Sequence, residues 1–206
     1  MLFYILGGIV IGFLLLTLLV SLFPNSLVDR EFSEEIQEHQ YPLLDVLMKA
    51  ISWPGYTPQS VIMVIVTSGV FLGFKLKREA LFILLTLFSG VISHSLKIII
   101  DRPRPTDDVV RIIEIARHQS FPSGHGLFYV IFFGFMIILM NHLKTVPKGI
   151  RITVISICAF LIFTIPFSRI YLGAHWFTDV LGGFMLGILS LFALSYYYLK
   201  TPSSAK

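Results

Sequence analysis

The chain has 206 residues, of which 55% are apolar and only 14% are charged, and its mean hydropathy is +0.82. A soluble globular domain is about a quarter charged, and a chain this small cannot hide so much apolar surface in one aqueous core. The composition therefore argues against a soluble enzyme, rules out a disordered chain, and indicates that lipid covers part of the surface. Cys158 is the single cysteine in the sequence, so no intrachain disulfide is expected.

Six apolar segments approach the length of roughly 20 residues that a transmembrane helix needs. In chain order they are Leu2–Leu22, Tyr56–Phe74, Ala80–Ile100, Gly126–Leu143, Ile152–Phe167 and Trp176–Leu199. The first segment lacks the basic start and the cleavage site of a signal peptide, so we predict that it is retained. The predicted fold is an all-α integral membrane protein, a bundle of six transmembrane helices that forms one domain over residues 1–206.

The segment between the first two spans, Asn25–Gly55, is too long for a simple turn. Its apolar residues recur at helical spacing with acidic residues between them. This pattern predicts short amphipathic helices that lie at the membrane interface. A solvated linker is the alternative interpretation.

The distribution of charge between the connecting segments predicts the orientation in the membrane. The segments after the second and fourth spans and the C-terminal tail hold eight basic residues and one acidic residue, whereas Asn25–Gly55 holds two basic and six acidic residues. Because positively charged connections stay in the cytoplasm, we expect both termini there. The connection that begins with Lys97 is an exception, since it carries five basic residues on the side predicted to be outside.

Three polar clusters fall at the ends of the last four predicted spans. The third span closes with Lys97, Arg104 and Pro105, and the fourth opens with Pro122, Ser123, Gly124 and His125; the fifth and sixth are joined by Ser168, Arg169, His175 and Asp179. With both termini inside, the third and fifth spans run outward and the fourth and sixth return. All three clusters are therefore expected to meet at the outer face.

The basic residues of these clusters suit the binding of a phosphoryl group. Lys97, Arg104 and Arg169 can neutralise the oxygens on which negative charge is held during phosphoryl transfer. Ser123 and Gly124 precede a predicted helix, and backbone N–H groups at a helix start bind anions. We therefore predict a phosphate site.

The histidines of the clusters suit catalysis on that phosphate. His175 and Asp179 are four residues apart on one helical face, so the carboxylate can hold one ring nitrogen as N–H and leave the other free to attack. His125 then remains to protonate the departing oxygen as a general acid.

Each element also has a structural interpretation. The Arg-Pro-Arg-Pro stretch around Arg104 can be an interfacial turn, Ser123 a helix cap, and His175 with Asp179 a structural pair. The joint occurrence of these groups favours function, because charges at the membrane border are costly and functional by default.

Other polar residues have no assigned catalytic role. Arg102 is either a phosphate ligand or a surface cation, and a substrate contact is left open for His118. The remaining histidines are expected to be structural or interfacial; they are His39, His94 and His142.

The combined pattern of the three clusters is similar to a known three-part signature. Lys97-x6-Arg104-Pro105, Pro122-Ser123-Gly124-His125 and Ser168-Arg169-x5-His175-x3-Asp179 resemble, at every signature position and in order, the type 2 phosphatidic-acid phosphatase superfamily. The resemblance implies that His175 is the nucleophile, that Asp179 orients it and that His125 is the acid. It also implies a phosphate site without metal or other cofactor, made by Lys97, Arg104, Ser123, Gly124 and Arg169.

The resemblance implies a phosphatase of a bacterial cell membrane that acts on the extracytoplasmic side through a phosphohistidine. The expected reaction is hydrolysis of phosphatidylglycerol phosphate to phosphatidylglycerol, of undecaprenyl diphosphate to the monophosphate, or of both. Expected partners are the lipid phosphate substrate and membrane lipids, with no nucleic acid and no obligate protein partner.

Two rival functions are weighed against this one. Vanadium-dependent haloperoxidases carry the same signature but are large soluble proteins, which six spans in 206 residues disfavour. A non-enzymatic membrane protein that binds or transports a phosphorylated lipid or solute is the alternative; the intact His175–Asp179 pair and the lack of a repeat pattern disfavour it.

Overall fold

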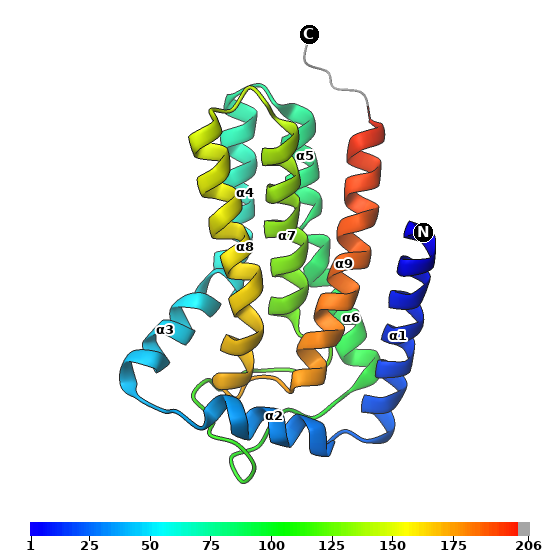
Figure 1. Ribbon diagram of the computed structural model, residues 1–206, viewed down its shortest axis with the longest axis vertical. Coiled ribbons are helices and arrows are strands. Elements are labelled where there is room, and N and C mark those ends of the chain that lie inside the picture. The colour runs from blue at the N-terminus through cyan, green and yellow to red at the C-terminus, as the bar shows by residue number, and fades with distance from the viewer. Residues whose placement is uncertain (202–206) are drawn as a thin grey trace.

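Helices make up the regular structure of residues 1–201, the part of the chain that the computed structural model describes, and no strand occurs there (Figure 1). The nine α-helices and one short 3₁₀ helix of this part are α1 (Leu2–Leu22), α2 (Leu27–Gln37), α3 (Pro42–Ser52), η1 (Trp53–Gly55), α4 (Gln59–Gly73), α5 (Lys77–Leu85), α6 (Phe88–Ile100), α7 (Gly124–His142), α8 (Lys148–Tyr171) and α9 (Phe177–Lys200). The predicted all-α membrane fold is confirmed.

Five helical segments of the described chain are long and apolar enough to cross a membrane. They are Phe3–Leu22, Lys77–Ile100, Gly124–His142, Lys148–Tyr171 and Phe177–Lys200. A sixth candidate is bent, because Pro42–Gly55 and Gln59–Gly73 meet at 56° and pass the same test only as a pair. The predicted second span, Tyr56–Phe74, is therefore longer than the helix found there. α4 has 15 residues, which span only about 22 Å.

The interfacial segment between the first two spans forms two helices, α2 and α3, as predicted, and a solvated linker is excluded. Ser26 caps α2 by accepting a hydrogen bond from the Asp29 backbone N–H at 3.2 Å. Pro42 begins α3, where its missing N–H costs nothing. α2 crosses one end of the bundle, and α3 leads from it back to the foot of α4 (Figure 1).

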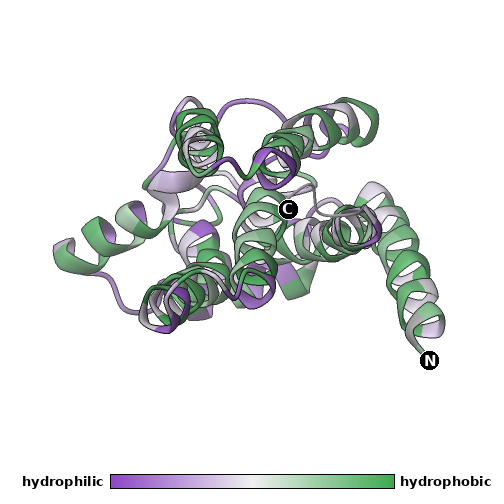
Figure 2. Cartoon of the chain, turned by 90° about the horizontal axis from the view of Figure 1, so that it is seen from above, coloured by the Kyte–Doolittle hydropathy of each residue, from purple (hydrophilic) through white to green (hydrophobic). Residues whose placement is uncertain are grey.

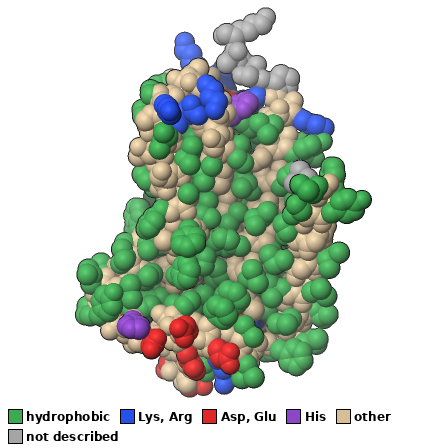
Figure 3. All heavy atoms as spheres, viewed as in Figure 1, with side chains coloured by type: hydrophobic (Ala, Val, Ile, Leu, Met, Phe, Trp, Pro, Cys, Tyr) green, Lys and Arg blue, Asp and Glu red, His purple; other side chains and the backbone are tan. Residues whose placement is uncertain are grey.

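Charge and hydropathy are separated along the molecule. Figure 3 shows acidic side chains at the end of the bundle that α2 crosses and Lys and Arg side chains at the opposite end, with hydrophobic side chains covering the length between them. From above, hydrophobic residues colour most of the helices that surround the bundle axis, and α1 stands at its edge (Figure 2). An apolar belt between two charged ends is what a lipid bilayer requires.

The core of the bundle is built around α7, whose side chains are buried over most of its length, Phe135 and Leu139 completely. α8 and α9 pack against it. The approach of α9 to the start of α7 depends on Gly183, since a Cβ atom there would lie 2.6 Å from the Ser123 carbonyl oxygen. This close approach brings the first turns of α7 and α9 together, and these turns carry His125 and Asp179.

Candidate active site

A cavity of about 880 Å³ opens between α4, α6 and α7, beside the C-terminal end of α8 and the loop that follows α6. Six of the eight predicted site residues line it: Lys97, Arg104, Gly124, His125, Arg169 and His175. The two others, Ser123 and Asp179, are fully buried and lie next to lining residues. The structure therefore brings together the three clusters that are separate in the sequence.

Both carboxylate oxygens of Asp179 accept hydrogen bonds, Oδ1 from Arg102 at 2.6 Å. Its Oδ2 accepts hydrogen bonds from the Trp176 backbone N–H at 2.9 Å and from the Ser120 hydroxyl, and it lies 3.4 Å from His175 Nδ1. Because Asp179 is in the first turn of α9, its bond to the Trp176 N–H also satisfies a free donor at the helix start. The carboxylate is thus fixed in place to orient the imidazole.

His175 lies in the short connection between α8 and α9, with only 3% of its surface exposed. Burial, followed by the positive charges of Arg104 and Lys97, lowers the pKa of His175 well below the usual histidine value. The ring is therefore neutral at neutral pH. With Nδ1 facing Asp179, the other nitrogen, Nε2, is 3.4 Å from Arg104 Nη1 on the cavity side, where an unprotonated nitrogen can act as a nucleophile.

Two of the predicted phosphate-binding cations are anchored on backbone carbonyls. Lys97 Nζ donates to the carbonyl oxygens of Gln119 and Ser120 at 2.6 and 2.8 Å. Arg104 Nε donates to the carbonyl of His118 at 2.7 Å. Burial and the charge of Arg169 lower the pKa of Arg104 to about 10, so it remains charged at neutral pH. Carbonyl partners hold these cations without cancelling their charge.

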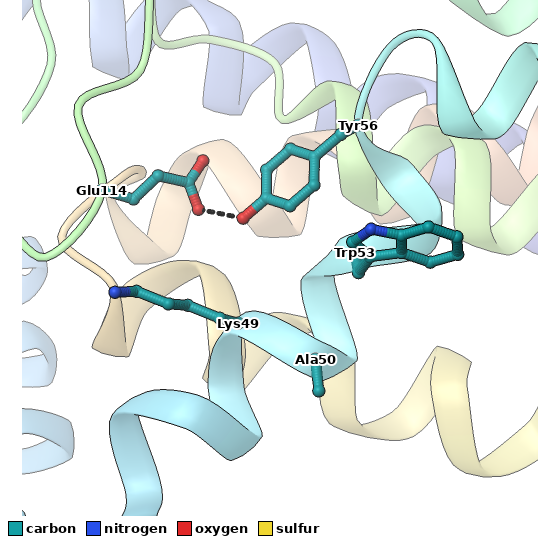
Figure 4. Close-up of a pocket in the computed structure, with 5 residues that line it drawn as sticks. All are labelled: Lys49, Ala50, Trp53, Tyr56 and Glu114. Atoms are coloured by element: carbon teal, nitrogen blue, oxygen red, sulfur yellow. Dashed lines mark hydrogen bonds between the residues drawn. The ribbon is translucent and has the colours of Figure 1, made fainter. Parts of the chain in front are cut away.

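Arg169 is held instead by a carboxylate that the sequence did not single out. Glu114 accepts from its Nη1 and Nη2 at 2.9 and 2.8 Å, and Ser52 accepts from Nη1 at 2.9 Å. Burial opposes ionisation of Glu114, but the hydrogen bonds and charge of Arg169 outweigh it and lower the pKa of Glu114. The Tyr56 hydroxyl also donates a hydrogen bond to Glu114. These two residues line both this cavity and a smaller one beside α3 (Figure 4).

Two nitrogen atoms at the cavity lack a hydrogen-bond partner among the described residues. They are Arg169 Nε and His125 Nε2, and both are buried. A buried polar atom without a partner is costly and rare in folded proteins. Their place in the wall of one cavity indicates where a ligand oxygen would bind.

Ser123 acts as the cap of α7, its hydroxyl oxygen accepting from the Gly126 N–H at 3.3 Å. The structural interpretation of this serine therefore applies, and it does not line the cavity. The backbone of Gly124 does line it, and Gly124 has little room for a side chain, since a Cβ would lie 3.1 Å from Ser93 Oγ. Among the described residues, no three His, Cys, Asp or Glu side chains are grouped so that they could hold a metal ion.

Arg102 is neither a surface cation nor a cavity residue, and both interpretations left open for it are wrong. It is 1% exposed and lies between two carboxylates, donating to Asp179 Oδ1 at 2.6 Å and to Asp29 Oδ2 at 2.7 Å. Asp29, on α2, also accepts from the Thr178 backbone N–H at 2.9 Å. No sequence pattern indicated this bridge, because Asp29 is one of six acidic residues in a segment predicted to be interfacial.

Known proteins resemble the chain in sequence and in fold. Residues 78–202 match the family model of the PAP2 superfamily. The phosphatidylglycerophosphatase B of Bacillus subtilis (strain 168) is 32% identical over 156 residues, which are 73% of either chain. The lipid A 1-diphosphate synthase of Escherichia coli (strain K12) is 31% identical over 126 residues, 55% of this chain and 49% of that one.

Among solved structures, the crystal structure of a transmembrane PAP2-type phosphatidylglycerolphosphate phosphatase from Bacillus subtilis superposes with a TM-score of 0.81 at 25% identity. The match covers 96% of this chain and 97% of that one. Fold, site and relatives define a multi-pass membrane enzyme that hydrolyses phosphate esters. The chain belongs to the PAP2 superfamily, as its motifs predicted.

The buried bridge of Arg102 generates a prediction about stability. Replacing Arg102 with Met leaves Asp29 and Asp179 as uncompensated buried charges, and we expect the free energy of unfolding to fall by about 3–5 kcal/mol. Arg111→Gln is the matched control, because Arg111 pairs with Asp45 at 2.7 Å but is 40% exposed, and the expected loss is below about 1 kcal/mol. Equilibrium unfolding in mixed micelles measures both, and equal losses would contradict the role of the bridge.

Proposed function

We propose that the chain removes the terminal phosphate of a membrane lipid, and that phosphatidylglycerol phosphate is its substrate. The observation that carries this proposal is the composition of the 880 Å³ cavity. Its catalytic end presents two histidines and three cations, and its wall continues along α4 and α6 past apolar and small residues such as Val61, Gly90 and Val91. Such a cavity suits a ligand with a phosphate head and a hydrocarbon chain.

The reaction proposed here has two steps. His175 Nε2 attacks phosphorus, the bond from phosphorus to the lipid oxygen breaks, and His125 gives its proton to that oxygen, which leaves as the lipid alcohol. Asp179 holds the Nδ1 proton and stabilises the charge on the phosphohistidine. Water then attacks the phosphohistidine, His125 takes a proton from it, and the phosphorus–nitrogen bond breaks to release phosphate.

Charge neutralisation at phosphorus is assigned to the protein itself. The proposed ligands of the phosphate oxygens are Lys97, Arg104, Arg169 and the backbone of Gly124. The unpaired Nε of Arg169 and the carbonyl-anchored cations support this assignment, because preorganised donors stabilise transition-state charge without reorganising. We therefore propose that no metal ion or other cofactor takes part.

Undecaprenyl diphosphate is the second candidate substrate. A PAP2 relative named lipid A 1-diphosphate synthase supports it, because that name shows a diphosphate-bearing lipid in the family. The same two-step reaction would yield the lipid monophosphate, which is a better leaving group than an alcohol and depends less on protonation by His125.

The first test is the release of phosphate from a panel of lipids by the purified protein. We expect hydrolysis of phosphatidylglycerol phosphate or undecaprenyl diphosphate, and we expect the rate to be unchanged in EDTA. A rate that EDTA abolishes and Mg²⁺ restores would contradict the metal-free mechanism. Tight lipid binding with no phosphate release would favour the non-enzymatic alternative.

The second test separates the roles of the two histidines. His175→Ala should abolish turnover and the acid-labile phosphoprotein trapped by rapid quenching. His125→Ala should be slow on lipids but regain part of its rate on an aryl phosphate, whose leaving group needs no proton. His39→Ala, whose side chain is 80% exposed, is the control without effect. A phosphoprotein that persists undiminished in His175→Ala would overturn the assignment.

The third test concerns the side of the membrane. We propose that both termini are cytoplasmic and that the site faces outward, because the acidic α2 end carries the cavity and the basic end follows the positive-inside rule. Cysteine introduced at Thr106 should react with an impermeant thiol reagent in intact cells, and cysteine introduced at Lys77 should not. Cys158 is buried, so the unmodified protein gives the background. The reverse labelling would place the site inside.

A further inference from the structure

Two histidines that the proposed chemistry does not use face each other in the same cavity. His94 lies on α6 and His118 on the loop before α7, and their ring centroids are 6.1 Å apart at an interplanar angle of 89°. Both line the cavity, and both are exposed. Within residues 1–201 the structure gives neither imidazole a hydrogen bond, so their N–H groups are available to a ligand.

One face of α6 places His94 between the catalytic cations and the apolar part of the cavity. Lys97, His94, Gly90 and Leu87 follow one another at intervals of three or four residues, and all four line the cavity. Residues at this spacing lie on one side of a helix. His94 is therefore about 4.5 Å along the helix axis from Lys97, in the direction in which the cavity becomes apolar.

The backbone conformation of His118 sets the position of its imidazole opposite His94. Its φ is +67°, a left-handed conformation that a residue with a Cβ rarely adopts. In this conformation its carbonyl oxygen accepts from Arg104 Nε at 2.7 Å, while its ring lies opposite His94. The same loop residue thus holds a proposed phosphate-binding arginine and places an imidazole next to the phosphate site.

Arg117 adds a positive charge to the part of the cavity that His94 and His118 line. Of the five basic residues in the connection that begins with Lys97, Arg102 and Arg111 pair with carboxylates, and Lys97 and Arg104 are anchored on carbonyls. Arg117 lines the cavity and is exposed, and it has no ion pair in the described part of the chain. The cavity next to the histidines is therefore positively charged.

We propose that His94, His118 and Arg117 form a second anion subsite, which binds the phosphate that is not cleaved. This inference rests on the proposed function and narrows its substrate class to lipids that carry two phosphate groups, either as a diphosphate or as a phosphomonoester joined to a phosphodiester. The order of groups along α6 matches such a lipid: cations for the terminal phosphate, imidazoles for the second phosphate, and apolar residues for the chain. A lipid with a single phosphate leaves the subsite empty.

The experiment compares kcat/KM for phosphatidylglycerol phosphate, a prenyl diphosphate and phosphatidic acid, which has one phosphate. Loss of a hydrogen bond to a charged group weakens binding by about tenfold to a hundredfold. In His94→Phe we therefore expect kcat/KM for the two-phosphate lipids to fall at least about tenfold more than for phosphatidic acid. His94→Lys, which restores a donor, should recover the preference. His142→Phe, at the other end of the molecule, is the control and should leave all three values unchanged.

A fall confined to one of the two-phosphate lipids would support the subsite and identify which kind of second phosphate it binds. An equal loss on all three substrates would assign His94 a structural role and overturn the proposal, as would an unchanged preference in His94→Phe.

A binding measurement keeps failure of the subsite distinct from failure of the proposed function. Wild-type protein should bind methylenediphosphonate more tightly than methylphosphonate, and His94→Phe should bind the two about equally. Equal binding of both probes by the wild type would overturn the subsite even if the enzyme is active. Hydrolysis of none of the lipids together with preferential binding of the diphosphonate would refute the enzymatic function and leave the subsite supported.

Discussion

The site depends on one buried interaction, the bridge in which the Arg102 guanidinium lies between Asp29 and Asp179. All three side chains are removed from solvent, and removing one partner from such an arrangement leaves an uncompensated charge. The bridge connects the interfacial helix α2, the loop after α6 and the first turn of α9. The carboxylate that faces His175 is thus fixed by an element far from it in the chain.

The other buried cations around the cavity are also stabilised by nearby oxygen atoms. A phosphate site needs concentrated positive charge, and concentrated charge near a membrane is expensive to bury. Carbonyl oxygens of residues 117–120 accept from Lys97 and Arg104 and leave their net charge intact. Glu114 instead pairs with Arg169 and compensates its charge, while the Arg169 Nε stays unpaired at the cavity. The loop after α6 therefore contributes backbone and one carboxylate to the site as well as cations.

Motifs were sufficient to predict the family and six of the residues that line the cavity, and the apolar segments predicted the helical membrane fold. Periodicity also predicted α2 and α3. Helix ends were less accurate: α8 begins at Lys148 and ends at Tyr171, beyond the apolar segment Ile152–Phe167, because helical hydrogen bonding continues through polar residues at the membrane border. Hydropathy does not indicate the bend before α4, since it measures the length of an apolar segment and not its direction.

The sequence by itself determined that this chain lies in lipid and that its polar motifs are those of the PAP2 superfamily, because residue types at fixed spacing can be recognised without coordinates. Only the tertiary structure decided which charges are paired. Arg102 and Arg117 are both arginines of the same connection. In the structure Arg102 is buried between two carboxylates, whereas Arg117 lines the cavity. Asp29 on α2 pairs with Arg102, and Glu114 in the loop after α6 pairs with Arg169 on α8. The pairing of charges distant in the chain is set by packing, which no local sequence pattern records.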